Sequence, residues 1–243
     1  MTEYYSLLED LMKLADLLLD SHALPKNEKE SLLLFSVGKT HKTLNAIILL
    51  CKNGMGQDAA ILSRSIFELS LISEYIITDR TDRRSKRFFS YDWIQRKNMI
   101  KYLEGTPEFD QHITPLERSE IINVEKKAKE AQLEFDYKNF TWRDKSLYNI
   151  AKDLNKLILF STAYQIQCTL VHSNPRAVNY YIKEEDGGMI VDSGPSNDFI
   201  EETLASSFIA YHSILELFND HFKKDKSREL KILSRQFQQL VKR

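Results

Sequence analysis

The stretch "DAAILSRSIFELSLISEYIITD", residues 58–79, decides the fold. Coiled into a helix, this sequence presents apolar side chains on nearly every side, so it predicts the central helix of a helical bundle. "NGMGQD", residues 53–58, stands before it, and Gly54 and Gly56 supply the backbone freedom that commonly ends a preceding helix. A helix buried on all sides needs other helices around it.

The rest of the chain supplies these helices. Apolar residues at three- and four-residue steps, together with helix-ending signals, predict further helices over about 3–22, 27–52, 81–103, 116–134, 157–172, 196–222 and 226–242, and a helix that begins at 147. Residues 178–192 differ, because β-favouring residues flank Glu-Glu-Asp-Gly-Gly, as in a β-hairpin. We therefore expect an all-α fold: one helical-bundle domain over 1–243, of about eight or nine helices, with one small inserted hairpin.

Composition narrows the possible classes of protein. Seven Gly and five Pro in 243 residues leave too few turns for an all-β or doubly wound fold. A formal net charge of −1 means that a nucleic acid could be bound only through a local basic patch. No apolar run approaches the length of a membrane span, and no signal peptide is visible at the start. We expect a cytoplasmic protein with no membrane partner, in which Cys51 and Cys168 are free, buried thiols.

The central helix carries two charged residues among apolar neighbours. Arg64 and Glu68 stand four residues apart and so share one face. Burying both charges costs several kcal/mol per ion unless each one is paired and hydrogen-bonded. Arg before Glu is also the less favoured order for a pair within one helix, so a third group should share them. Two interpretations stay open: a structural clamp between helices, or a pocket in which Arg64 binds an anion and Glu68 orients a base.

A later helix ends on a histidine. In "CTLVHSNPR", residues 168–176, the apolar run stops at His172, and Asn174-Pro175 prevents it from continuing. Tyr164, Cys168 and His172 recur every four residues and form one stripe. His172 is either a structural residue or, together with Arg64 and Glu68, part of a catalytic set for general acid–base work and anion stabilisation.

Clusters of positively charged residues provide further candidates for substrate binding. "DRTDRRSKRFFSYDWIQRKNMIKY", residues 79–102, holds eight Lys or Arg with interleaved aromatic residues. Arg83, Arg84 and Arg87 are therefore candidate contacts to a phosphate backbone, with a plain solvated helix as the alternative. Arg176 and Tyr164 are the candidate substrate-binding residues near His172. We expect no metal site and no cofactor, because metal-ligand spacings and nucleotide-binding motifs are missing. The last helices, 197–242, are expected to pack on the rest of the chain or to form the interface of a homodimer or with another protein.

Several of these pieces together resemble a known family. A Gly-containing turn before an Ala-rich helix with Arg-x-x-x-Glu, then a Trp, a Tyr and a Ser-or-Cys-x-x-x-His helix end, is similar to a widespread bacterial all-helical family of unknown function. The matching positions, within about residues 30–185, are Gly56, Ala60, Arg64, Glu68, Trp142, Tyr164, Cys168 and His172. Cys168 departs from the commoner Ser. The resemblance implies that Arg64, Glu68 and His172 belong to one site, and it implies no reaction.

A looser analogy is to HEPN-type helical domains, which include ribonuclease toxins and antiviral effectors. Those enzymes typically carry an Arg-x4–6-His motif, whereas this chain has only the reversed His172-x-x-x-Arg176. Two hypotheses result. In the first, the protein is a metal-independent enzyme of a toxin or phage-defence kind that cleaves RNA or a nucleotide. In the second, it is a non-catalytic helical module for ligand sensing or oligomerisation with a buried Arg-Glu-His clamp.

Overall fold

A computed structural model describes residues 2–20, 24–138, 141–185 and 187–242 of the chain. Two compact units are present: Met1–Ile77 with Leu147–Arg243 (unit 1), and Thr78–Ser146 (unit 2). The expected all-α class with one small hairpin is confirmed. Whether both units fold as the single domain expected over 1–243 stays a prediction.

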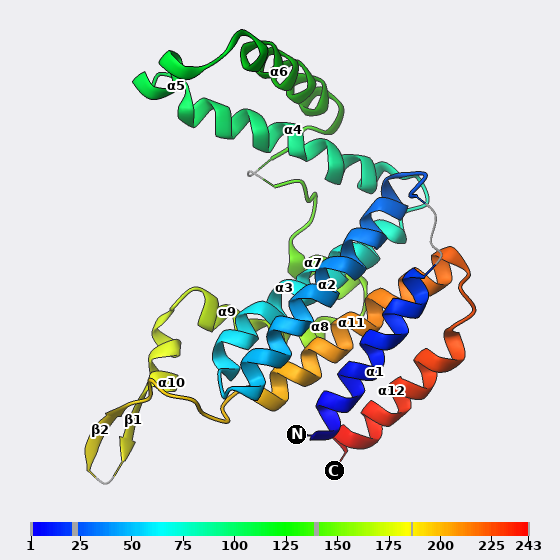
Figure 1. Cartoon of the computed structure of the whole chain (residues 1–243), viewed down its shortest axis with the longest axis vertical. Coiled ribbons are helices and arrows are strands. Elements are labelled where there is room, and N and C mark those ends of the chain that lie inside the picture. The colour runs from blue at the N-terminus through cyan, green and yellow to red at the C-terminus, as the bar shows by residue number, and fades with distance from the viewer. Residues whose placement is uncertain (1, 21–23, 139–140, 186, 243) are drawn as a thin grey trace. The chain divides into compact units, whose positions relative to one another are not determined.

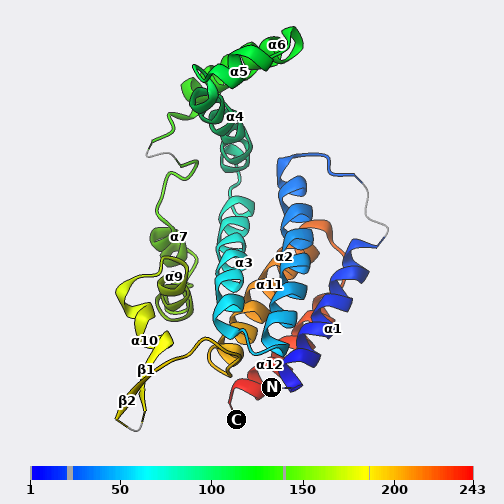
Figure 2. The same ribbon diagram turned by 60° about the vertical axis from the view of Figure 1, so that its left-hand side comes forward.

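Unit 1 is built around the central helix. Helix α3, Gly56–Ile77, lies between α2, Glu28–Lys52, and α11, Ile200–Phe222, and these two form its most extensive contacts (Figures 1 and 2). Buried residues, including Ala59, Ile66 and Leu71, cover most of the circumference of α3, and the face that carries Arg64 and Glu68 is half-buried. The prediction from residues 58–79 is therefore confirmed.

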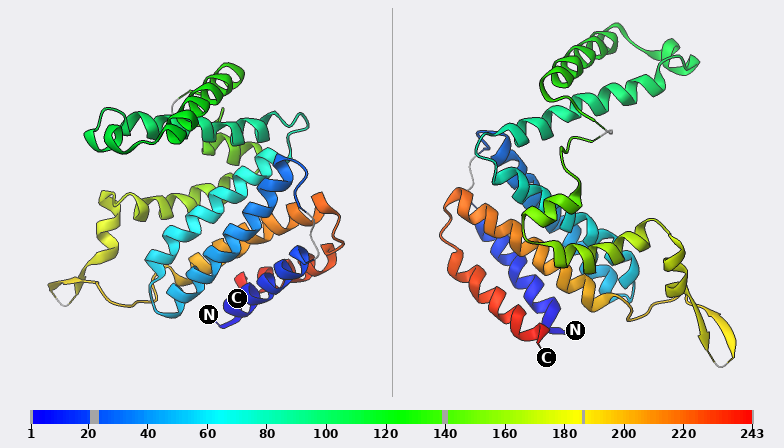
Figure 3. Two further views of the ribbon diagram at one scale, coloured as in Figure 1. Left: turned by 45° about the horizontal axis from the view of Figure 1, so that its top comes forward. Right: turned by 180° about the vertical axis from the view of Figure 1, so that it is seen from behind.

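The N-terminal and C-terminal helices close the other side of α11. Helices α1, Thr2–Leu19, and α12, Ser227–Val241, pack on each other and on α11 (Figure 3). The ring of Phe237 stacks on Phe208 with centroids 4.4 Å apart and meets Tyr4 edge-on at 6.3 Å. Phe237 on the apolar stripe of α12 is thus packed against α11 and α1, while the binding of a second subunit through the last helices stays a prediction.

Helices α3 and α11 approach most closely where both begin. Gly54, with φ +74°, follows the end of α2 in the left-handed conformation that glycine favours. Gly56 is needed for a different reason: a Cβ added there would stand 2.1 Å from the carbonyl oxygen of Asp198 and 2.9 Å from the Ile200 side chain. Gly56 therefore sets how closely the two helices pack.

The chain that returns from unit 2 packs on α3 as short helical segments. These are α7, Leu147–Asp153; α8, Leu157–Leu159; a π-helical turn, Phe160–Tyr164; and α9, Gln165–Val171. The helix expected over 157–172 is therefore interrupted by one wide turn. A 3₁₀ turn at Pro175–Ala177, α10 at Val178–Tyr181 and the hairpin of β1, Ile182–Glu185, and β2, Gly188–Val191, follow. Short segments such as α8 and α10 take the number of described helices above the eight or nine expected.

Unit 2 is a helical hairpin with its own core. Helices α4, Arg83–Leu103, and α6, Pro115–Phe135, pack side by side, and the short α5, Pro107–His112, connects them. The core consists of Tyr91, Ala131, Phe135 and Tyr137, with Ile94 and Trp142 packed against it. The Tyr137 hydroxyl donates a hydrogen bond of 2.7 Å to the carbonyl oxygen of Arg87, which ties the segment after α6 to α4.

Two further expectations are tested by the described residues. Cys51 and Cys168 are free thiols, as expected; Cys51 is buried, but Cys168 is only half-buried. Burial raises the pKa of the Cys51 thiol to about 12, so it stays protonated. Within the described ranges, every helix is too short or too polar to cross a membrane.

Two glycine-to-alanine changes test the close approach of α3 and α11. Gly38→Ala, inside α2 where an added Cβ meets no atom within 4 Å, should raise the free energy of unfolding by about 0.5–1 kcal/mol. Gly56→Ala should lower it by about 1–3 kcal/mol, because the added methyl group has no room. Urea unfolding of both variants measures this difference. If Gly56→Ala is as stable as Gly38→Ala, the packing described here is wrong.

Candidate functional site

Arg64 and Glu68 form an ion pair on the face of α3 that meets the returning chain. The Arg64 Nη2 atom lies 3.0 Å from Glu68 Oε1, and the two side chains are 18% and 29% exposed. Both are thus largely withdrawn from water without being fully enclosed. A pair at this depth needs further hydrogen bonds to offset desolvation.

Tyr164 supplies those hydrogen bonds from the last position of the π-helical turn. Its hydroxyl donates to Glu68 Oε1 at 2.7 Å and accepts from Arg64 Nη2 at 3.3 Å. The guanidinium carbon also faces the Tyr164 ring, 5.2 Å from its centroid. Phe160 stacks on the same ring at 4.6 Å, which fixes the orientation of Tyr164. Tyr164 is therefore the third group that the buried pair on α3 requires.

The contacts among Arg64, Glu68 and Tyr164 hold Arg64 and Tyr164 each in one protonation state. Burial favours the neutral form of Arg64, but the hydrogen bond with Tyr164 and the charge of Glu68 outweigh it and raise the pKa of Arg64. Burial, followed by the hydrogen bond to Glu68, raises the pKa of the Tyr164 hydroxyl well above its usual value. Arg64 is therefore a permanent cation and Tyr164 a permanent donor at neutral pH.

The backbone explains why α9 ends on His172. The amide of Ser173, at φ +45°, donates to the Leu170 carbonyl at 3.3 Å, and the amide of Asn174 donates to the Thr169 carbonyl at 3.4 Å. This pair of bonds is the Schellman arrangement, which satisfies the last carbonyls of a helix. The Asn174 side chain then accepts from the Arg176 amide at 3.0 Å and starts the next turn. His172 is thus fixed as the last residue before a sharp change of direction.

The imidazole of His172 lies against Arg64. Its Nε2 atom is 3.5 Å from Arg64 Nη1, while the residue as a whole is exposed. A guanidinium has only donors, so this contact is a hydrogen bond only when Nε2 carries no proton and Nδ1 carries it. Arg64 Nε is buried and has no hydrogen-bond partner among the described residues. The four residues therefore form one chain of contacts that runs from the protein interior to solvent.

Two other histidines of unit 1 are placed differently. His212 is 8% exposed; its Nε2 lies 2.9 Å from the Leu230 carbonyl and its Nδ1 lies 3.4 Å from Glu216, so it joins α11 to α12. His41 Nδ1 lies 3.1 Å from the Tyr211 hydroxyl and joins α2 to α11. Both act as structural links between helices. His172 is exposed and in contact with a fixed cation.

A buried group of polar side chains next to Arg64 was not predicted from the sequence. The Ser63 hydroxyl is 2.9 Å from the hydroxyls of Ser206 and Ser207, and Gln167 Nε2 donates to Ser206 at 3.1 Å. These bonds join α3, α9 and α11 directly beside Arg64. Serines within apolar helices were the available signal, but single serines are common in helices. The group helps to fix α9, and hence His172, against α3.

The remaining candidate residues are not brought into this network. Arg176 is exposed, four residues beyond His172. Arg83, Arg84 and Arg87 belong to unit 2. There, Arg87 donates to the carbonyl oxygens of Trp142 and Phe135, and Arg83 donates to that of Glu134 at 3.3 Å. Much of the donor capacity of Arg87 is thus used inside unit 2, although its role as an RNA contact stays a prediction.

No group of three or more His, Cys, Asp or Glu side chains is arranged to hold a metal ion in the part of the chain that the structure describes. The site residues themselves include one carboxylate, which is already bound to Arg64 and Tyr164. Their arrangement suits proton transfer at His172 and binding of an anion at Arg64.

Removing the carboxylate tests the network. Glu68→Ala should lower the free energy of unfolding by on the order of 2 kcal/mol, less than for a fully buried pair, since both side chains keep some exposure. The exposed pair of Asp92 and Arg96 has the same four-residue spacing and is the control; Asp92→Ala should cost below about 0.5 kcal/mol. Chemical unfolding measures both. Equal losses in the two variants would show that Glu68 does not compensate a buried charge.

Comparison with known proteins gives one result. The model of a family of unknown function (DUF5677) matches residues 30–189. No curated protein and no solved structure matches the chain. The match covers well over half of the sequence and contains Arg64, Glu68, Tyr164 and His172. The chain therefore belongs to this family of unknown function.

Proposed function

We propose that the protein is a metal-independent enzyme of the cytoplasm that cleaves RNA or a related nucleotide, as part of a toxin-type or phage-defence system. One observation carries the proposal: the exposed imidazole of His172 lies 3.5 Å from a guanidinium that is itself fixed by two partners. An enzyme that cleaves a phosphodiester without a metal needs a group that moves a proton and a fixed cation for the phosphate.

Each residue has a proposed role. His172 takes a proton on Nε2, whose lone pair faces Arg64 Nη1 before the substrate binds. Arg64 directs Nη1 toward the same position and binds the phosphate oxygens as their negative charge grows. Glu68 and Tyr164 act through Arg64, by holding its guanidinium in place and in its charged state. Their contribution is preorganisation, because the cation does not have to move when the substrate binds.

The proposed reaction is a transfer within the RNA strand. His172 removes the proton of a 2′-hydroxyl, whose oxygen attacks the adjacent phosphorus and forms a new P–O bond. The bond from phosphorus to the 5′-oxygen breaks, and the proton held by His172 passes to that leaving oxygen. The products are a 2′,3′-cyclic phosphate and a free 5′-hydroxyl, and no water or other reactant is consumed.

A cavity of about 320 Å³ lies beyond the end of α9, and Ser173, Asn174, Ala177, Tyr181 and Ile182 line it. His172 and Arg64 do not line this cavity, so a substrate bound there would have to extend past its opening to reach them. This volume is at the lower end of the range for small-molecule sites. Arg176, exposed nearby along the chain, is the proposed contact to a second phosphate. Arg83, Arg84 and Arg87 stay predictions as further contacts to RNA.

A second candidate function is supported by the hydrogen bonds that the site residues make with one another. Glu68, Tyr164 and Nη2 of Arg64 all bind one another, which is what a clamp between α3 and the returning chain requires. In this case the protein is a non-catalytic module that senses a ligand or oligomerises, with a homodimer or another protein bound through its C-terminal helices. In this second candidate function, the exposed imidazole of His172 has no role.

Cleavage of end-labelled single-stranded RNA by the purified full chain, in the presence of EDTA, tests the proposal. The wild type should release fragments that end in a 2′,3′-cyclic phosphate. His172→Ala should lower the rate by about 100-fold or more, the usual contribution of a general acid–base group. Its melting temperature should not change, because His172 is exposed. His112→Ala removes an exposed histidine of unit 2 and should cleave at the wild-type rate.

Arg64→Lys separates the two candidates further. Lysine keeps the charge but not the geometry of the guanidinium, so the enzyme should lose most of its activity. Intact RNA with the wild type, or cleavage that survives His172→Ala, would contradict the proposed enzyme. Intact RNA together with a large destabilisation by Glu68→Ala would leave the clamp.

A further inference from the structure

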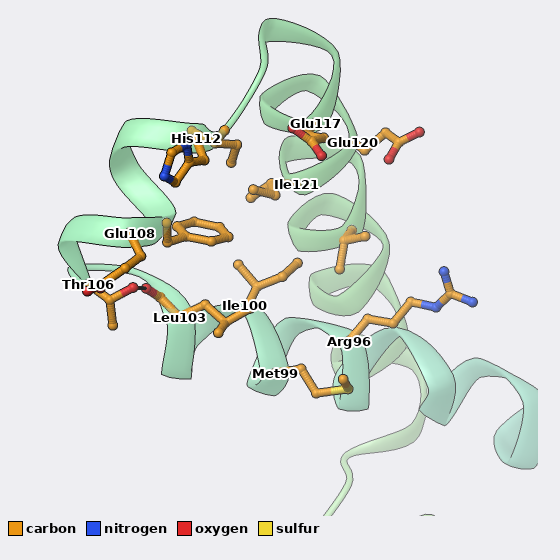
Figure 4. A pocket seen from close by; sticks show the side chains of 13 residues that line it. Arg96, Met99, Ile100, Leu103, Thr106, Glu108, His112, Glu117, Glu120 and Ile121 are labelled. Carbon is orange, nitrogen blue, oxygen red and sulfur yellow. Dashed lines mark hydrogen bonds between the residues drawn. The ribbon is translucent and has the colours of Figure 1, made fainter.

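Unit 2 contains a cavity of about 630 Å³ that has no part in the proposed function. It lies where the end of α4, the short α5 and the start of α6 meet (Figure 4). Its volume is in the middle of the range of known small-molecule sites. Three helices of one compact unit form its walls.

The inside of this cavity is apolar. Met99, Ile100 and Leu103 come from α4, and Ile121 and Val124 from α6, while Phe109 of α5 closes one side. Figure 4 shows Ile100 and Ile121 pointing toward each other across the space. Met99 is 67% exposed and Leu103 49% exposed, so part of the apolar wall is in contact with water. Covering this surface is favourable for any ligand with an apolar body.

The rim of the cavity is acidic. Glu108 lies at the α5 edge and Glu117 at the α6 edge, while the carboxylate of Glu120 on α6 points outward (Figure 4). Glu117 accepts hydrogen bonds of 2.7 Å from the amide and the hydroxyl of Thr114, which lower the pKa of its carboxyl and keep it charged. Among the described residues, the side chains of Glu108 and Glu120 take part in no hydrogen bond or ion pair. Their negative charges are thus not offset by a paired cation.

Arg96, the one permanent cation among the described residues that line the cavity, is paired with a carboxylate outside the lining. Arg96 donates to Asp92 Oδ2 at 2.6 Å, and its guanidinium lies 5.3 Å from the centre of the Trp93 ring. Figure 4 shows this guanidinium pointing away from the middle of the cavity. The surrounding sequence agrees, because residues 104–120 contain five Asp or Glu and one Arg. The electrostatic potential at the opening therefore favours a positive charge.

We propose that this cavity binds an amphiphilic cation, meaning a small molecule with an alkyl or aromatic body and one ammonium-type group. The body lies among Ile100, Leu103, Phe109 and Ile121. The cationic group lies at the rim beside Glu108, in the combined negative potential of Glu108, Glu117 and Glu120. A small molecule fits better than a helix of another protein, since three helices already surround the space.

Calorimetric titration of the full chain with two matched probes tests the charge preference. Octyltrimethylammonium and octyl sulfate, both below their micelle concentrations, have the same alkyl chain and opposite charges. The cation should bind at least about tenfold more tightly than the anion. Glu108→Gln with Glu120→Gln should remove most of this preference. Glu104→Gln with Glu130→Gln changes the net charge equally, outside the cavity lining, and should keep it.

Filling the cavity tests the location. Ile121→Trp should weaken binding of the cation by about tenfold or more, because the indole occupies the space. Ile122→Trp places the same group at a neighbouring position that is 66% exposed and does not line the cavity, and it should bind like the wild type. Ile100→Phe is a second filling variant, and circular dichroism shows whether each variant is folded.

Three results would overturn the proposal. The first is binding of octyl sulfate as tight as that of the cation. The second is unchanged binding in a folded filling variant. The third is no binding of either probe, which would indicate that the surface serves a protein partner instead.

Discussion

The structure of unit 1 depends on the withdrawal of one guanidinium from water. Arg64 stands on the central helix of unit 1, and Glu68 and Tyr164 offset the cost of withdrawing its charge from water there. Glu68 comes from the same helix, one turn away. Tyr164 comes from a segment 100 residues later, so its hydrogen bond with Arg64 joins the returning chain to α3.

Three features of unit 1 place the groups that surround Arg64. The π-helical turn at Phe160–Tyr164 ends on the residue that reaches Arg64, and such turns are frequent at functional sites. The buried serines and Gln167 hold α9 in register with α3 and α11. The Schellman end of α9 then stops the chain with the His172 imidazole against Arg64. The arrangement thus leaves a fixed cation in contact with an imidazole that is open to solvent.

The sequence allowed the helical class, the central helix and the hairpin to be predicted, because periodicity and turn residues report directly on local structure. It also indicated that Arg64 and Glu68 need a third partner, since a charge on an apolar helix face is costly wherever it occurs. The π-helical turn could not be predicted, because it adds one residue to a pattern that still reads as helical. The hydrogen bonds of Arg83 and Arg87 to carbonyl oxygens of unit 2 could not be predicted either, because every residue has a backbone carbonyl and the sequence does not show which one an arginine reaches.

The protonation pattern of His172 tests the central claim most directly, namely that this imidazole and Arg64 form one unit. Long-range ¹H–¹⁵N NMR of the folded protein, at a pH where imidazoles are neutral, distinguishes the two neutral tautomers of His172. The account predicts that Nδ1 carries the proton, that Nε2 is free, and that Arg64→Gln changes the resonances of His172. A proton on Nε2, or resonances that match those of the exposed His112 and ignore Arg64→Gln, would contradict it.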